Sequence, residues 1–291
     1  MLIREALAQG SADLKYAGIE TPALDAALLL AHVLKTTRTA LIASGKEKIK
    51  EADCAAFCGL IERRCGGECA AYLTGKKEFR GLEFAVNKSV LVPRPDTETL
   101  VETALNKLEI WNEELGIDCL RVLDLCTGSG AVAVSLKHER PELDVYASDI
   151  SEEALETAKA NAAHLLPDKK IHFFLGNLYD ALPCSLLPAS CSMIISNPPY
   201  IPSSEIDTLS AEVRNEPRIA LDGGASGLEI IKRIIEDAPD YLRQNGLLLL
   251  EADPRQMHGI SIMLDKRGFK DILIYKDLSG SDRVIGGSYE K

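Results

Sequence analysis

A short loop with two prolines has the residue types needed to hold a planar nitrogen group. It follows the apolar run 193–195 and consists of Asn197, Pro198, Pro199 and Tyr200. Each proline fixes its own φ and lacks an N–H group, so the loop is stiff. The Asn197 side-chain oxygen and the Pro198 carbonyl are two acceptors for one –NH2 group, and Tyr200 can cover a flat amide or base. Asn-Pro pairs also form ordinary turns, so this interpretation depends on the rest of the chain.

A glycine-rich turn is the second candidate for chemistry. It lies between a strand expected at 121–125 and a helix expected from Ala131, and it consists of Cys126, Thr127, Gly128, Ser129 and Gly130. Glycines at such a place let the backbone approach a ligand at the helix N-terminus. Asp149 ends the next expected strand, roughly 20 residues beyond the last glycine, which is the spacing of a carboxylate that binds ribose hydroxyls. The pattern predicts a ligand with a nucleotide part.

This ligand is either a dinucleotide or S-adenosylmethionine. Residues 128–133 also satisfy the Gly-x-Gly-x-x-Ala form of dinucleotide sites. Asp124, however, precedes the turn and offers a carboxylate to a cationic amino-acid group, and a hydride-transfer enzyme has no need of the loop at 197–200. S-adenosylmethionine accounts for both features, with its ribose at Asp149, its adenine at the end of the third strand and its methyl group directed at the loop. We therefore favour S-adenosylmethionine.

Hydrophobic periodicity divides the chain into a helical part and an α/β part. Residues 1–75 have apolar positions at helical spacing. Two short strands at 78–86 and 89–92, about an Asn87-Lys88 turn, are expected to form a linking hairpin. Beyond residue 121 strands alternate with helices, which predicts an open, doubly wound α/β sheet. The strands are expected at 121–125, 143–148, 171–175, 191–196, 246–252, 270–275 and 282–286.

Composition limits the classes of partner and location. The chain has 291 residues, 46% hydrophobic content and a formal charge of −11, which opposes a broad basic surface for nucleic acid. No apolar stretch reaches membrane-spanning length, and the N-terminus lacks the apolar core of a secretory signal. We expect a cytoplasmic protein without membrane contact.

Four of the eight cysteines invite a metal interpretation. Cys54, Cys58, Cys65 and Cys69 have offsets that fall on one helix face. Gly66-Gly67 should end that helix before Cys69, and zinc ligands usually come in closer pairs with a long gap between them. Reduced thiols, which are often buried, explain the pattern better than a metal site, so no metal is expected.

Taken together, these residues resemble a known family. Asp124 to Gly130 with Asn197 to Tyr200 resembles the class I S-adenosylmethionine-dependent methyltransferases that act on a planar nitrogen. The rest of the sequence resembles the HemK/PrmC family, the peptide chain release factor glutamine methyltransferases, over nearly the whole chain. The segments that carry this resemblance are 72–79, 92–98, 215–217, 221–228 and 282–284.

The resemblance implies a Rossmann-like, seven-stranded methyltransferase domain at 96–291, a β-hairpin linker at 76–95 and an all-α domain at 1–75 that docks the release factor. The implied reaction, linked to translation termination, is methylation of the amide nitrogen (N5) of the glutamine in a Gly-Gly-Gln loop. By resemblance, Asn197 to Tyr200 hold this amide as the catalytic residues. The implied cofactor-binding residues are Cys126, Thr127, Gly128, Ser129 and Gly130 on the methionine side, Asp149 at the ribose, Asn177 near the adenine, and Asn197.

Two positions depart from the family pattern, and two others stay open. Cys126 replaces a glycine, and Asn177 stands where an aspartate is usual. Arg94, between two prolines, and Glu216, before a proline, each suit either function or packing.

Two other functions remain as alternatives. An adenine-amino (N6) methyltransferase acting on DNA or RNA would use the same loop, because that amine is also planar; the net charge of −11 and the lack of a basic recognition domain disfavour it. A non-catalytic protein that binds partners through its helical domain would have no use for residues 197–200. We expect release factors as partners and no direct nucleic-acid substrate.

Overall fold

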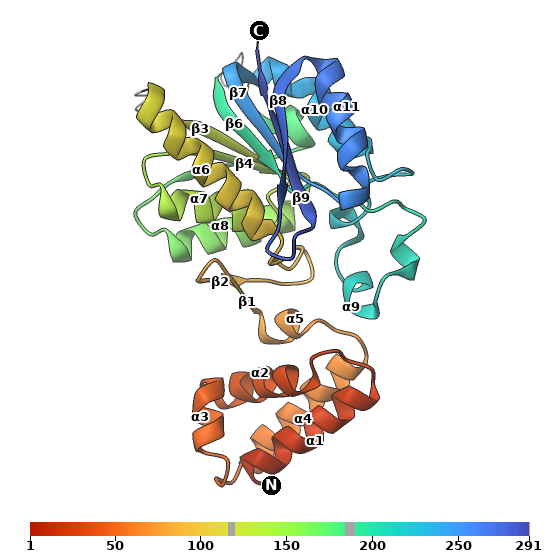
Figure 1. Ribbon diagram of the computed structural model, residues 1–291. Coiled ribbons are helices and arrows are strands. Elements are labelled where there is room, and N and C mark those ends of the chain that lie inside the picture. Colours follow the sequence, from red (N-terminus) through yellow and green to blue (C-terminus); the bar gives the residue numbers. More distant parts are fainter. Residues whose placement is uncertain (116–119, 184–189, 291) are drawn as a thin grey trace. The chain divides into compact units, whose positions relative to one another are not determined.

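The computed structural model describes residues 1–115, 120–183 and 190–290 and divides the chain into two compact units (Figure 1). The first unit comprises Met1–Lys76 together with Leu209–Asn215, and the second comprises Lys77–Thr208 and Glu216–Lys291. The chain therefore passes between the units after residues 76, 208 and 215.

The first unit is helical, as predicted. An apolar core that includes Leu14, Leu29 and Phe57 holds its helices together. A Cβ atom on Gly10 would lie 2.8 Å from the ring of Phe57, so a glycine is needed where the first and fourth helices approach. The helices are α1 (Ile3–Tyr16), α2 (Pro22–Leu34), α3 (Arg38–Ala43), α4 (Glu51–Cys65), α5 (Ala70–Thr74) and α9 (Ala211–Arg214).

The helix that carries the cysteines of this unit ends where Gly66-Gly67 predicts. Helix α4 ends at Cys65 with Gly66 as its C-cap, and Cys69 is buried before α5. Cys54 and Cys58 lie on α4 as free thiols. Among residues 1–115, 120–183 and 190–290, no group of three or more His, Cys, Asp or Glu side chains is arranged to hold a metal ion.

A buried arginine attaches the segment 209–215 to the helices of this unit. Arg64, at 3% exposure, donates from Nε to Asp25 Oδ2 at 2.8 Å and from Nη2 to Glu212 Oε2 at 2.7 Å. Asn215 adds a hydrogen bond from Nδ2 to the Gly67 carbonyl at 2.9 Å. The segment that follows the proline loop in sequence is therefore held by the helical unit.

A hairpin forms, but the predictions of its strands at 78–86 and 89–92 and of its turn at Asn87-Lys88 are wrong. Strands β1 (Lys76–Phe79) and β2 (Leu82–Ala85) pair about Arg80 and Gly81, whose φ angles are 49° and 74°. Two left-handed central residues match the twist of paired strands. At Asn87, the side-chain oxygen instead accepts from the Ser89 N–H at 2.8 Å, which makes a local turn without a strand partner.

The second unit contains the predicted doubly wound, seven-stranded sheet, in the order β5-β4-β3-β6-β7-β9-β8 (Figure 1). Strand β9 runs antiparallel to both of its neighbours, and the pairs from β5 to β7 are parallel. The strands are β3 (Arg121–Leu125), β4 (Asp144–Asp149), β5 (Ile171–Leu175), β6 (Cys191–Ser196), β7 (Leu242–Glu251), β8 (Phe269–Lys276) and β9 (Asp282–Tyr289).

Helices cover both faces of the sheet because its central strands are apolar on both sides. Val122 packs in the core that contains residues of α6 to α8, whereas its neighbour Leu123 packs in the core that contains residues of α10 and α11. The helices are α6 (Thr97–Leu115), α7 (Ala131–Glu139), α8 (Glu152–Leu165), α10 (Glu229–Tyr241) and α11 (Met257–Arg267).

The topology locates the chemistry. Strand β3 pairs with β4 on one side and β6 on the other, so the connections after β3 and β6 leave in opposite directions. A ligand crevice opens at such a switch point, at the carboxyl ends of the strands. None of the helices in the described part of the chain is both long and apolar enough to span a membrane.

We predict that Arg64→Ala destabilises the first unit by about 3–5 kcal/mol, because Asp25 is then left buried without its partner. Amide hydrogen exchange should accelerate in α2, α4 and residues 209–215, while β3 and β6 keep their protection. The matched control is Arg63→Ala, which breaks an exposed pair with Glu68 and should cost less than about 1 kcal/mol. Equal effects of the two variants would contradict the role of Arg64.

Candidate active site

Two carboxylates determine the path of the glycine turn. Thr127 donates from Oγ1 to Asp124 Oδ2 at 2.6 Å, and the Gly128 N–H donates to Asp149 Oδ2 at 2.8 Å. The second oxygen of Asp149 accepts from the Ser151 N–H at 2.9 Å. The turn is therefore held from the ends of both β3 and β4.

The turn exposes backbone where a ligand can approach. Gly128 and Gly130 have φ angles of 56° and 81°, and a Cβ atom on Gly128 would meet nothing within 4 Å. Cys126 also has a left-handed φ of 60°, which gives a physical reason for the glycine usual at this position. Burial raises the pKa of the Cys126 thiol well above its ordinary value, so this thiol is not a nucleophile.

Burial also weakens the acidity of both carboxyl groups. It raises the pKa of Asp124 to about 7, against the opposing hydrogen bonds from Thr127 and the Ala133 N–H. It likewise raises the pKa of Asp149, which the N–H groups of Ser151 and Gly128 oppose. A cation bound beside these groups would restore their charged forms, so the donor set fits a positively charged ligand.

The proline loop begins where β6 ends. Asn197 donates from Nδ2 to Thr97 Oγ1 at 3.1 Å, and the Tyr200 hydroxyl lies 3.5 Å from Glu251 Oε1. A Cβ atom on Gly223 would lie 2.8 Å from the Pro199 carbonyl oxygen, so a glycine is required where residues 221–227 pack on the loop. This close approach explains Gly223.

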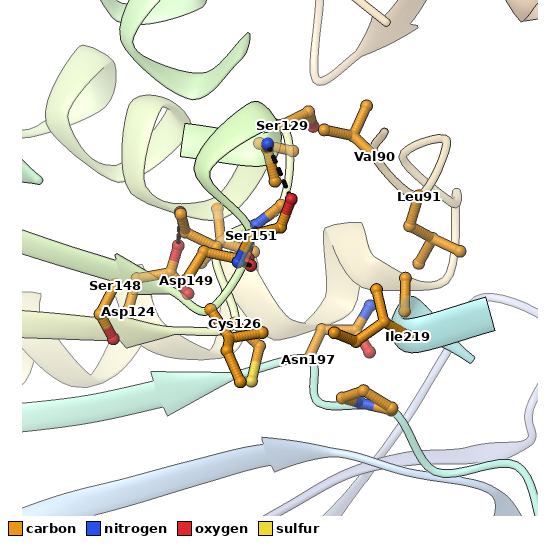
Figure 2. Close-up of a pocket in the computed structure, with 18 of the residues that line it drawn as sticks. Val90, Leu91, Asp124, Cys126, Ser129, Ser148, Asp149, Ser151, Asn197 and Ile219 are labelled. Carbon is orange, nitrogen blue, oxygen red and sulfur yellow. Dashed lines mark hydrogen bonds between the residues drawn. The ribbon is translucent and has the colours of Figure 1, made fainter. Parts of the chain in front are cut away.

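One pocket in the second unit brings most of the predicted residues together (Figure 2). In Figure 2, Asp149 and Ser151 lie on one side of it and Asn197 and Ile219 on the other. The predicted residues that line it are Cys126, Thr127, Gly128, Ser129, Asp149, Asn177, Asn197 and Pro199. Gly130, Pro198 and Tyr200 do not line it: Gly130 caps α7, Pro198 is buried, and Tyr200 packs against the core on the α10 and α11 side.

Comparisons with known proteins identify the family. Residues 5–75 match the PrmC N-terminal domain, and residues 108–215 match the methyltransferase small domain. The release factor glutamine methyltransferase of Neisseria gonorrhoeae is 41% identical over 93% of this chain and 94% of its own. That of Moorella thermoacetica is 37% identical over 98% of both chains. The chain belongs to the release factor glutamine methyltransferase family.

Solved structures agree on the fold. The hMettl16 catalytic domain, determined in complex with a 3′UTR hairpin, is 16% identical, with a TM-score of 0.55 over 85% of this chain and 84% of its own. A methyltransferase from Pyrococcus furiosus is 18% identical, with a TM-score of 0.50 over 74% of this chain and 92% of its own. At these identities the likeness shows the class I methyltransferase fold alone.

The structure distinguishes the roles of Arg94 and Glu216, which the sequence left open between function and packing. Arg94 lines the pocket and donates from Nη2 to Glu216 Oε1 at 2.5 Å, while Glu216 Oε2 accepts from the Val92 N–H at 3.1 Å. Glu216 is therefore a buried support, and Arg94 is the member of the pair that reaches the pocket. Asn177 also lines the pocket, and its side-chain oxygen accepts from Arg233 Nη1 at 3.3 Å.

Sequence reasoning missed several pocket residues. Val90, Leu91 and Ile219 form apolar wall, and Thr97 contributes a hydroxyl. None of these belongs to a spaced motif, so no local pattern identifies them. Thr97 alone carried a signal, because it stands in the segment 92–98 that resembles the family.

The pKa of Asp124 predicts a pH-dependent stability of the unliganded enzyme. Its carboxyl pKa is raised from 3.8 to about 7, so the folded state binds more protons than the unfolded state between these values. Stability therefore falls as pH rises through this window. Asp124→Asn should remove that loss, so the melting temperature of the variant relative to wild type should increase from pH 4.5 to pH 8. Asp207→Asn, at a side chain 87% exposed, is the control; an Asp124→Asn difference that is the same at both pH values would contradict the assignment.

Proposed function

We propose that this enzyme transfers the methyl group of S-adenosylmethionine to the glutamine side-chain nitrogen (N5) in the Gly-Gly-Gln loop of peptide chain release factors. One observation carries the proposal: the Asn197 side chain and the glycine turn line the same pocket. A planar amide held at Asn197 would thus lie beside a ligand held at the turn. The names of the relatives supply the substrate class.

The chain's own residues suit the cofactor. S-adenosylmethionine carries a sulfonium and an ammonium group, and when bound it supplies an activated methyl group. The carboxylates of Asp124 and Asp149 favour such a cation at the pocket. We assign residues 126–130 to its methionine side, Asp149 to its ribose hydroxyls and Asn177 to its adenine edge.

The loop at 197–200 would activate a poor nucleophile by orientation. An amide nitrogen shares its lone pair with the carbonyl, so its nucleophilicity is low. Asn197 lines the pocket and its side-chain oxygen would accept one N–H bond, and the Pro198 carbonyl, which does not line it, is proposed as the acceptor of the second. Two acceptors would fix the nitrogen and stabilise the positive charge that develops on it. The N–C bond forms as the S–C bond of the donor breaks, and one amide proton passes to solvent. No strong general base is required beforehand.

The helical domain at 1–75 is proposed to dock the release factor. Residues 5–75 match the PrmC N-terminal domain, and the names of the relatives give release factors as their substrates. Remote docking contacts would raise the rate for the whole substrate over that for a fragment.

Labelled S-adenosylmethionine tests the function directly. The enzyme is incubated with a purified release factor, with the same factor in which the glutamine of Gly-Gly-Gln is alanine, and with a short Gly-Gly-Gln peptide. We expect one methyl group on that glutamine by mass mapping, none on the alanine control, and a much lower kcat/KM for the peptide. Equal kcat/KM for peptide and whole factor would refute docking. Preferential methylation of an adenine-containing oligonucleotide would refute the protein substrate.

Asn197→Ala should lower kcat by about 100-fold or more, because one of two acceptors for the substrate amide is lost. The dissociation constant for S-adenosylmethionine should stay within about tenfold, since most cofactor contacts remain. Asn106→Ala makes the same chemical change on the exposed side of α6 and should leave kcat unaltered. Unchanged turnover of Asn197→Ala would remove the basis for its role.

A further inference from the structure

Behind Asn197 lies a polar network from two other elements. Thr97, the first residue of α6, accepts the hydrogen bond from Asn197 Nδ2 at 3.1 Å and is 4% exposed. Glu251, the last residue of β7, is 1% exposed, interacts with the Thr97 hydroxyl and lies 3.5 Å from the Tyr200 hydroxyl through Oε1. Asn197 and Thr97 line the pocket, and Glu251 stands behind them.

The buried carboxyl group of Glu251 is unfavourable for the stability of the fold. Its Oε2 atom is buried and has no hydrogen-bond partner in the described part of the chain, a condition that destabilises the folded state. A well-packed apolar residue would avoid this cost. The carboxyl group is therefore better explained by what it does to its neighbours.

Proton counting shows what it does. A threonine hydroxyl has one proton to donate, and an ionised carboxylate accepts only. When Glu251 is ionised, Thr97 donates to it and must accept from Asn197, so the Asn197 NH2 group faces Thr97. The Asn197 oxygen then faces away from Thr97, where an amide N–H of the substrate needs an acceptor.

We propose that Thr97 and Glu251 are positioning residues that hold the Asn197 amide in its acceptor orientation. This inference rests on the proposed function of Asn197 as an acceptor for the substrate amide. A protonated Glu251 can donate to Thr97, whose own proton then becomes available to the Asn197 oxygen. The amide can turn over in that state and present N–H groups to a substrate that is itself a donor.

The charge of Glu251 depends on its surroundings. Burial raises the pKa of Glu251 to about 7; Thr97, Arg283 and Tyr200 lower it, and Asp96 raises it. Arg283 on β9 is in turn paired with Asp96 at 3.1 Å and with Asp277 at 3.4 Å. Because the ionised form gives the acceptor orientation, kcat at saturating cofactor should fall as pH decreases below about 7.

Three variants test the proposal in the full-length enzyme with a release factor as substrate. Thr97→Val removes the hydroxyl at nearly constant shape and should lower kcat by about 10- to 100-fold, with the cofactor dissociation constant within about twofold. Thr97→Ser should restore most of the activity. Glu251→Gln should lower kcat at pH 8, and it should also remove the fall of kcat below about pH 7. The control is Thr103→Val, at another buried threonine of α6, and circular dichroism checks that each variant folds.

A double-mutant cycle separates positioning from general packing. If Thr97 acts through Asn197, Thr97→Val should have almost no further effect in an Asn197→Ala background. The same fold loss in both backgrounds would overturn the proposal, as would a Thr97→Val enzyme with wild-type kcat and pH profile. Failure of the proposed function is distinguishable, because the wild-type enzyme would then not methylate the release factor, whereas failure of the role of Asn197 alone would leave Asn197→Ala fully active.

Discussion

The hydrogen bonds from the glycine turn to Asp124 and Asp149 are the interaction on which the rest of the site depends. They join the ends of β3 and β4, since Thr127 binds one carboxylate and the Gly128 N–H binds the other. The turn keeps its left-handed residues, and α7 starts at Ala131, with the Ala133 N–H donating to Asp124 Oδ2 at 3.2 Å. Asp124 is buried and Asp149 is partly buried, and this desolvation weakens both as acids. Under the proposed function, a cationic cofactor at this site would restore the charged forms of both carboxylates.

Hydrogen bonds to neighbouring elements hold the proline loop and the end of the strand that precedes it. Ser196 donates to the Leu125 carbonyl at 2.6 Å, and Gln256 donates to the Tyr200 carbonyl at 2.9 Å. Glycines at 223 and 227 let a neighbouring segment approach the loop backbone closely. Such fixation suits a reaction whose rate depends on alignment more than on acid–base chemistry, because a rigid acceptor loses little entropy when the substrate binds.

One segment of the helical unit lies, in sequence, between two parts of the second unit. Residues 209–215 follow the proline loop in sequence yet belong to the helical unit, where Arg64 binds Glu212. The next residue, Glu216, returns to the catalytic unit and binds Arg94 and the Val92 N–H. Segment 209–215 of the helical unit is thus joined to the second unit at both of its ends, after residues 208 and 215.

The sequence by itself determined the strands of the sheet, the glycine turn with Asp149, and the proline loop at 197–200, because each is encoded within a few residues by apolar runs, glycines and prolines. It misplaced the hairpin turn, since Asn87-Lys88 and Arg80-Gly81 are both local turns and only strand pairing chooses between them.

Tertiary structure alone decided that Asp149 binds the Gly128 N–H and that Thr97 contacts Asn197, 100 residues away. It also decided that 209–215 joins the helical unit. These contacts link side chains from separate elements, and no periodicity or spacing records which elements the sheet topology brings together.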